Sequence, residues 1–183
     1  MVQNRFTAVP VAGNDVLHNR FAAIAVAGMM ALSFVAGAGS AEVGEPAPPF
    51  SLTTADGKTM ALADLRGRVV YVDFWASWCA PCRRSFPWMN EMQQRYGDRG
   101  FTVIAVNVDR RRADAEQFLQ SNSARFAVVY DDRGATPQAY SVKGMPSSYL
   151  IDARGTVVDV ELGFRDDRKG AIEDQIRSLL SNR

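Results

Sequence analysis

The chain has 183 residues, of which 47% are hydrophobic, and this length suits one domain with a hydrophobic core rather than two. The formal net charge is +1, and basic residues gather only at Arg110-Arg111-Arg112, which we interpret as a solvated turn. This overall charge balance gives no electrostatic basis for binding nucleic acid or an acidic partner. Two cysteines and one histidine, His18, are too few for a structural zinc site, which needs about four ligands.

Residues 1–41 have the three parts of a secretory signal peptide. Arg5 and Arg20 precede an apolar run from Phe21 to Ala41, and small residues close it at Gly39-Ser40-Ala41. We expect cleavage near Ala41. An uncleaved N-terminal membrane anchor is the alternative, because about 20 apolar residues can span a bilayer. Either outcome places the folded part outside the cytoplasm, and we expect it in the periplasm, where disulfides persist.

Residues 42–49 are predicted to form an extended lead-in to a domain that covers residues 50–183. The segment Glu45-Pro46-Ala47-Pro48-Pro49 cannot enter a regular element, because proline lacks the N–H donor and restricts the residue before it. Two short alternating runs, 50–53 and 58–62, flank the turn signal Ala55-Asp56-Gly57. This pattern predicts a small β-hairpin at the start of the domain.

The apolar run from Val69 to Trp75 predicts a central strand that is covered on both faces. From Cys79 to Tyr96, apolar residues recur at steps of three and four and predict an amphipathic helix. The remaining elements are expected as strands at 101–109, 126–130, 148–152 and 156–162, the last two paired as an antiparallel hairpin, and as helices at 113–122, 136–140 and 167–180. The alternation predicts an α/β fold in which helices flank a mixed central sheet on both faces.

Both cysteines lie in Cys79-Ala80-Pro81-Cys82, where the predicted central strand gives way to a helix. Two cysteines separated by two residues at such a junction form a typical dithiol/disulfide redox centre. If the helix begins near Cys79, the free N–H groups of its first turn stabilise a thiolate there. Cys82, one turn further on, can then close a disulfide with it.

Cys79 is therefore the predicted attacking thiol and Cys82 the predicted resolving thiol. A purely structural disulfide is the alternative, although such bonds generally close longer loops.

The motif from Val72 to Cys82, together with Gly144-Met145-Pro146 and a closing hairpin and helix, resembles a thioredoxin-fold protein. The N-terminal hairpin, an inserted strand-helix unit and Arg83-Arg84-Ser85-Phe86-Pro87 make the chain more specifically similar to the exported bacterial TlpA/ResA-like thiol-disulfide oxidoreductases. The resemblance runs from about Gly44 to the C-terminus. It implies a thioredoxin fold with an added N-terminal β-hairpin and that inserted unit.

The resemblance also implies roles for single residues. Pro146 matches the family's cis-proline, and the backbone of Met145 is then expected to hydrogen-bond an extended substrate. Asp73 matches a buried acid, whose raised pKa would let it take the proton of Cys82; a solvated strand end is the alternative. The expected substrate contacts are Trp78, Ala80, Pro81, Met145 and Pro146. Trp75 either frames the site beside Trp78 or packs in the core.

Ser85 departs from the family pattern, because ResA-like members carry a glutamate three residues after the second cysteine. A role of that acid in proton handling or partner recognition cannot be transferred to this chain. Asp73 is the acid that could replace it. The family's link to cytochrome c maturation therefore stays open here.

Ala80-Pro81 contains no histidine or charge that would stabilise a thiolate, and this favours the reducing end of the range from about −270 mV for thioredoxin to about −120 mV for DsbA. We expect a monomeric disulfide reductase of envelope proteins, with the Cys79–Cys82 disulfide as its redox group and no separate cofactor or metal. The family implies a membrane electron donor of the DsbD/CcdA type.

Two alternatives remain open at this point. A thiol peroxidase is the first, because residues 49–68 are similar to peroxiredoxin-like chains, although Ser77-Trp78 is not the Thr-Pro pattern of those enzymes. A copper-binding or docking module without turnover is the second, although no histidine follows His18.

Overall fold

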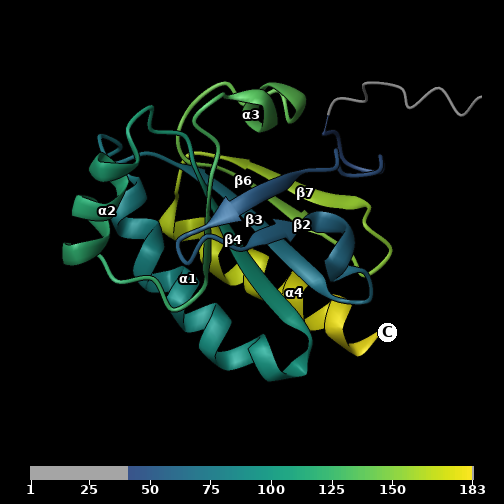
Figure 1. Cartoon of the computed structure of the whole chain (residues 1–183). Coiled ribbons are helices and arrows are strands. Elements are labelled where there is room, and N and C mark those ends of the chain that lie inside the picture. The colour runs from purple at the N-terminus through teal and green to yellow at the C-terminus, as the bar shows by residue number, and fades with distance from the viewer. Residues whose placement is uncertain (1–40, 183) are drawn as a thin grey trace, which may run out of the picture. The chain divides into compact units, whose positions relative to one another are not determined.

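The computed structural model describes residues 41–182, which contain a seven-stranded sheet with strand order β2-β1-β5-β4-β3-β6-β7 (Figure 1). The predicted leader lies outside the described residues except for Ala41. Within residues 41–182, no helix has the length and apolar character needed to span a bilayer.

The sheet is mixed, as predicted. Its strands are β1 (Ser51–Thr54), β2 (Thr59–Ala61), β3 (Val69–Trp75), β4 (Phe101–Asn107), β5 (Ala127–Tyr130), β6 (Ser147–Ile151) and β7 (Val157–Leu162). β4 pairs in parallel with β3 and β5, whereas β6 pairs antiparallel with β3 and β7. The predicted N-terminal hairpin is confirmed as β1–β2, and β1 extends the sheet by pairing antiparallel with β5.

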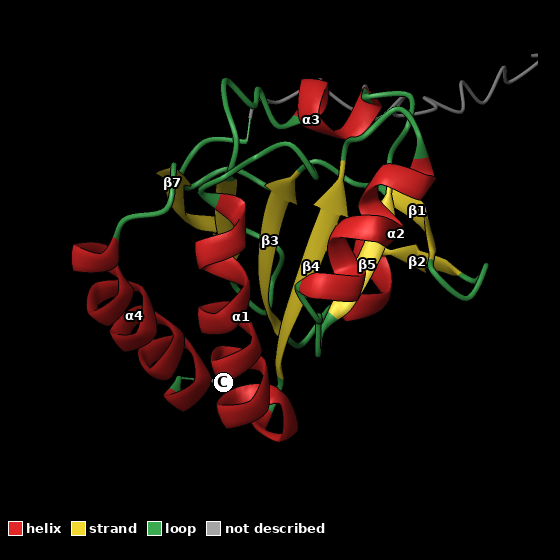
Figure 2. Cartoon of the chain, turned by 90° about the vertical axis from the view of Figure 1, so that its left-hand side faces the viewer, coloured by secondary structure: helices red, strands yellow, loops and turns green. Residues whose placement is uncertain are grey.

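Helices cover the sheet on both faces. They are α1 (Cys82–Tyr96), α2 (Arg112–Ser121), α3 (Ala135–Ala139) and α4 (Lys169–Ser181), with 3-10 turns at Leu62–Leu65, Gly97–Arg99 and Asp166–Arg168. Figure 2 shows α1, α2 and α4 on one side, where Met89, Phe118 and Ile176 pack against β3 in one hydrophobic cluster. On the opposite face, Leu62 and Tyr140 belong to a second cluster.

Strand β3 belongs to both clusters, because its side chains alternate between the two faces. Tyr71 and Trp75 lie in the cluster with α1, while Val72 and Phe74 lie in the other. Every residue of β3 is buried, and the strand has a neighbour on each side. The loop that follows Trp75 therefore starts from the middle of the sheet.

The predicted lead-in is only partly extended, because the N–H of Glu45 donates to the carbonyl of Glu42 and closes a turn before Pro46; the segment is hydrogen-bonded to the hairpin of β6 and β7. The N–H of Gly44 donates to the carbonyl of Val157 at 2.8 Å, and the N–H of Val157 donates to the carbonyl of Glu45 at 2.9 Å. The N–H of Ala47 donates to the carbonyl of Gly155 at 2.9 Å. These bonds attach the segment before β1 to the turn between β6 and β7 and to the first residue of β7.

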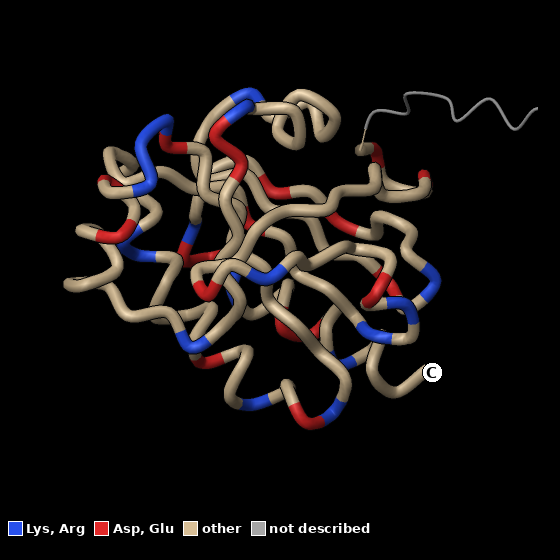
Figure 3. Tube along the Cα trace, in the orientation of Figure 1, with Lys and Arg blue, Asp and Glu red and all other residues tan. Residues whose placement is uncertain are grey.

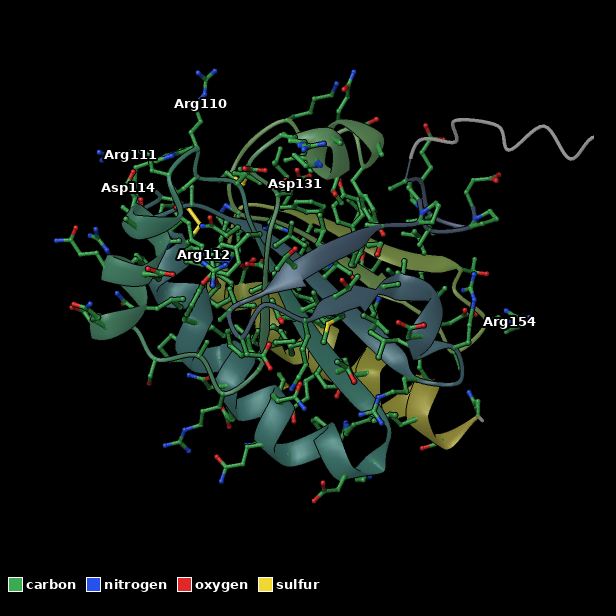
Figure 4. The ribbon with its side chains drawn as sticks, in the orientation of Figure 1. Arg110, Arg111, Arg112, Asp114, Asp131 and Arg154 are labelled. Atoms are coloured by element: carbon green, nitrogen blue, oxygen red, sulfur yellow. A yellow bond between two sulfur atoms is a disulfide. The ribbon has the colours of Figure 1, made fainter. Side chains whose placement is uncertain are left out.

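Acidic and basic residues are interspersed along the trace (Figure 3), in agreement with the nearly neutral composition. The run Arg110-Arg111-Arg112 is exposed, as predicted, but only Arg110 and Arg111 lie outside a helix, because Arg112 is the first residue of α2. Arg111, directly before α2, binds Asp114, and Arg112 binds Glu116 one turn further along α2, whereas Arg110 points away from the protein (Figure 4).

Candidate active site

Cys79 and Cys82 form a disulfide at the end of the central strand. The S–S distance is 2.02 Å and the two Cα atoms are 5.4 Å apart. Both cysteines belong to the hydrophobic cluster under α1, with 3% of Cys79 and 0% of Cys82 exposed. Cys79 is thus the slightly more accessible member of a buried pair.

Helix α1 begins at Cys82 and not at Cys79, so the predicted start was wrong by three residues. Cys79 lies in a turn, where its N–H donates to the carbonyl of Ala76 at 3.0 Å. Pro81 lacks an N–H and occupies the position before the helix, with its carbonyl accepting the N–H of Arg84 at 3.0 Å.

The sulfur of Cys79 nevertheless receives a helix N–H. The backbone N–H of Cys82, at the first position of α1, donates to Cys79 Sγ at 3.2 Å. Free N–H groups at a helix N-terminus stabilise negative charge. The same N–H also donates to the carbonyl of Cys79 at 3.2 Å, so the contact with the sulfur reaches Cys79 from outside the helix rather than from within its first turn.

The loop before Cys79 is held by hydrogen bonds to Asp109, a residue that the sequence analysis did not identify. Its carboxylate accepts the N–H of Ser77 at 2.9 Å and the hydroxyl of Ser77 at 3.0 Å. The side chain of Asn107 donates to the same carboxylate at 2.8 Å. The sequence could have indicated Asp109 only through its place after β4, because the adjacent parallel strands β3 and β4 end at the same edge of the sheet.

The prediction that β4 continues to Asp109 was also wrong. The strand ends at Asn107, because the side chain of Asn107 accepts the N–H of Asp109 at 3.1 Å and turns the chain toward the site.

Asp73 is buried in the middle of the sheet, with 1% of its surface exposed, so the alternative of a solvated strand end is excluded. Burial raises the pKa of this carboxyl group well above its ordinary value. Its Oδ2 atom has no hydrogen-bond partner in the described part of the chain. By the alternation of β3, Asp73 points to the same face as Tyr71 and Trp75, which is the face that holds both cysteines.

The two tryptophans near the disulfide differ in their surroundings. Trp75 is fully buried, and its ring centroid lies 5.0 Å from that of Phe86 and 4.9 Å from that of Phe118, so it is a core residue. Trp78 is 69% exposed. Ala80 is also exposed, and with Trp78 it forms part of the accessible rim of the disulfide.

The peptide bond between Met145 and Pro146 is cis, as the resemblance implies. Pro146 precedes β6, whose first residue, Ser147, lies opposite Phe74 near the end of β3. Met145 packs against the hydrophobic cluster that contains both cysteines. The fold therefore brings the predicted proline segment to the edge of the sheet where the disulfide lies.

Ser85, which replaces the family glutamate, is buried, and its hydroxyl donates to the carbonyl of Cys82 at 2.9 Å. It stabilises the first turn of α1 and offers no titratable group. Within residues 41–182, no group of three or more His, Cys, Asp or Glu side chains is arranged to hold a metal ion.

Comparison with known proteins places the chain among thiol-disulfide proteins. Residues 42–176 match the Redoxin family model. The chain is 34% identical over 138 residues to a thiol-disulfide oxidoreductase ResA of Bacillus cereus, covering 75% of this chain and 79% of that protein. It is 36% identical over 128 residues to ResA of Bacillus subtilis, covering 70% and 72% of the two chains.

Solved structures agree with these relatives. A putative thiol:disulfide interchange protein DsbE from Chlorobium tepidum is 50% identical, with a TM-score of 0.74 over 77% of this chain and 99% of that one. A putative thioredoxin from Neisseria meningitidis is 30% identical, with a TM-score of 0.67 over 75% and 92% of the two chains.

Proposed function

Because the chain belongs to the Redoxin family and is a TlpA/ResA-like thiol-disulfide oxidoreductase of the thioredoxin superfamily, we propose that it acts as an exported disulfide reductase of envelope proteins. The observation that carries the assignment of roles is the hydrogen bond from the N–H of Cys82 to Cys79 Sγ. It supports a thiolate on the more accessible of the two sulfurs.

In the first step, the thiolate of Cys79 attacks one sulfur of the substrate disulfide. The substrate S–S bond breaks, one substrate sulfur leaves as a thiolate, and Cys79 becomes joined to the other in a mixed disulfide. Trp78, Ala80, Pro81, Met145 and Pro146 would contact the substrate at this stage. The exposure of Trp78 supports that role.

In the second step, Cys82 attacks Cys79 Sγ and the second substrate sulfur leaves. The Cys79–Cys82 disulfide forms, so the substrate disulfide has gained two electrons and the chain has lost two. Cys82 must give up its proton first, and Asp73 is proposed to accept it. The raised pKa of Asp73 supports this role, because a carboxylate in an apolar site is a stronger base than one in water.

The reducing direction is supported by the residues between the cysteines. Neither Ala80 nor Pro81 carries a charge that would favour the reduced form. A reductase outside the cytoplasm needs a supply of electrons, and a membrane donor of the DsbD/CcdA type would provide it. The basic, apolar and small-residue parts of residues 1–41 support export.

The reduction potential of the Cys79/Cys82 couple tests the direction. We expect a value near or below about −220 mV after equilibration with glutathione or dithiothreitol. A value near about −120 mV would make the protein an oxidant and overturn the proposal.

A trapping experiment tests the two-cysteine mechanism itself. The Cys82→Ser variant should accumulate mixed disulfides with substrate proteins on Cys79, since the resolving sulfur is missing. The matched Cys79→Ser variant should trap none. Absence of an adduct that thiol reductants can release would contradict the mechanism.

A further inference from the structure

A cleft of about 530 Å³ lies between α2 and the chain segment that carries the two cysteines, although neither cysteine lines it. One wall comes from the redox segment, with Ser77 two residues before Cys79 and Arg83 directly after Cys82. The other wall comes from α2. Asp114, near the start of α2, is the acid on this wall (Figure 4). The volume is in the range of ordinary ligand sites.

The cleft presents one positive charge that no described side chain neutralises. Arg83 is exposed, and within residues 41–182 its guanidinium has a ring contact at 5.9 Å from the centroid of Phe118 but no ion pair or hydrogen bond. The acid on the opposite wall, Asp114, is already bound through both oxygens by Arg111, at 2.6 and 3.0 Å. Asp109 is buried and bonded to Ser77.

Uncharged polar groups complete the lining. Gln117 and Ser121 are exposed on α2, and neither side chain makes a hydrogen bond to another described residue. An amide and a hydroxyl can donate to and accept from a peptide backbone. Phe118 adds an apolar surface below the guanidinium.

We propose that this cleft binds an acidic stretch of the disulfide-containing polypeptide, with Arg83 binding a carboxylate close in sequence to the reactive cysteine. This inference rests on the proposed function, because it assigns the class of substrate to the same site. A guanidinium pairs with a carboxylate through parallel hydrogen bonds. Consecutive Cα atoms are about 3.8 Å apart, so a carboxylate within reach of Arg83 would belong to a substrate residue only a few positions from the cysteine in the mixed disulfide.

Arg84 provides a matched control. It is the next residue of α1, carries the same charge and is also exposed. Its guanidinium is bound instead by Asp166 at 3.6 Å and by the carbonyl of Phe164 at 3.4 Å, and it does not line the cleft. If the substitutions acted only through the overall electrostatic potential of the protein, charge reversal at Arg83 and at Arg84 should change the reaction rates alike.

The test uses three disulfide-linked peptides that differ only at two positions flanking one cysteine, with Glu, Gln or Lys there. The rate of reaction with the reduced protein is followed by tryptophan fluorescence. We expect the Glu peptide to react about tenfold faster than the Gln peptide, the size of effect of one charge-assisted hydrogen bond. Arg83→Glu should abolish this preference and favour the Lys peptide, Arg83→Gln should abolish it alone, and Arg84→Glu should retain it.

Equal rates for the three peptides with the unaltered protein, or equal effects of Arg83→Glu and Arg84→Glu, would overturn the inference and leave the proposed function intact. Failure to reduce any peptide or oxidised glutathione would overturn the proposed function, and this inference with it. The Gln peptide serves as the internal reference, since a change in the potential of the cysteine pair alters all three rates together.

Discussion

The carboxyl group of Asp73 lies in the centre of the sheet, and one of its oxygens has no hydrogen-bond partner among residues 41–182. An ionised carboxylate there is costly, so the folded protein retains the proton at a pH where the unfolded chain has released it. Between the ordinary pKa of 3.8 and the raised pKa of the folded state, stability therefore falls as the pH rises.

Asp73→Asn should remove this dependence. We expect the free energy of unfolding of the variant to rise relative to the unaltered protein by about 1.4 kcal/mol for each pH unit within that window. Urea unfolding from about pH 4 to about pH 8 measures the difference, in which the contributions of all other acids cancel. Parallel stability profiles would contradict the raised pKa.

The same variant should slow resolution of a mixed disulfide by about a hundredfold.

Ser85 offers a second residue-level test. Replacing it by Glu, the residue of the ResA-like pattern, would place a carboxylate at a buried position that now makes one hydrogen bond to Cys82. We expect a loss of at least about 2 kcal/mol in the free energy of unfolding, because the charge loses its hydration. Ser85→Ala, which removes only the hydrogen bond, should cost about 1 kcal/mol. A Glu variant as stable as the Ala variant would show that the site admits water.

At the level of elements, apolar periodicity predicted most of the sheet and helices. The predicted strand from Val69 to Trp75 has the same bounds as β3. A strand that is covered on both faces consists almost entirely of apolar residues, so its ends are visible in the sequence. The start of α1 could not be predicted from this pattern. It depends on which carbonyl accepts each N–H around Pro81, and apolar periodicity does not report hydrogen bonds.

Some of the site residues could be predicted from the sequence and others could not. Cys79, Cys82 and Pro146 carry a recognisable spacing, whereas Asp109 acts on Ser77 across two strands and has no local signature. Trp75 and Trp78 look alike in the sequence, and only the packing separates the core residue from the exposed one.

Asp109→Ala tests the contribution of the loop before Cys79. It removes an acceptor of three hydrogen bonds, two of them from Ser77 and one from Asn107. We expect a loss of about 2–4 kcal/mol in the free energy of unfolding and faster hydrogen exchange at the Ser77 amide. Ser77→Ala removes one of these bonds and should cost about 1–2 kcal/mol. Unchanged exchange at Ser77 in the Asp109 variant would contradict the role of this carboxylate.

For the molecule as a whole, the core is divided into two hydrophobic clusters, one on either side of β3. Both cysteines belong to one cluster, and Phe74, which contacts Tyr140 and Tyr149, belongs to the other. We expect that a substitution on the face of the sheet opposite the cysteines can lower the free energy of unfolding without changing the surroundings of the two sulfurs.

Phe74→Ala should accordingly lower the free energy of unfolding by about 3–5 kcal/mol, as expected for loss of a buried aromatic side chain. The reduction potential of the cysteine pair should remain that of the unaltered protein. Urea unfolding and equilibration with glutathione measure the two quantities separately. A shift in potential that accompanies the loss of stability would show that the sheet transmits changes from one cluster to the other.

The burial of Cys82 also affects how the protein responds to oxidative stress. Small oxidants meet Cys79 first, since Cys82 has no exposed surface. A sulfenic acid formed on Cys79 condenses with the neighbouring thiol and returns to the disulfide before it can reach the irreversible sulfinic and sulfonic stages. Each accidental oxidation therefore ends in a normal state of the working cycle, and the chain needs reduction rather than replacement.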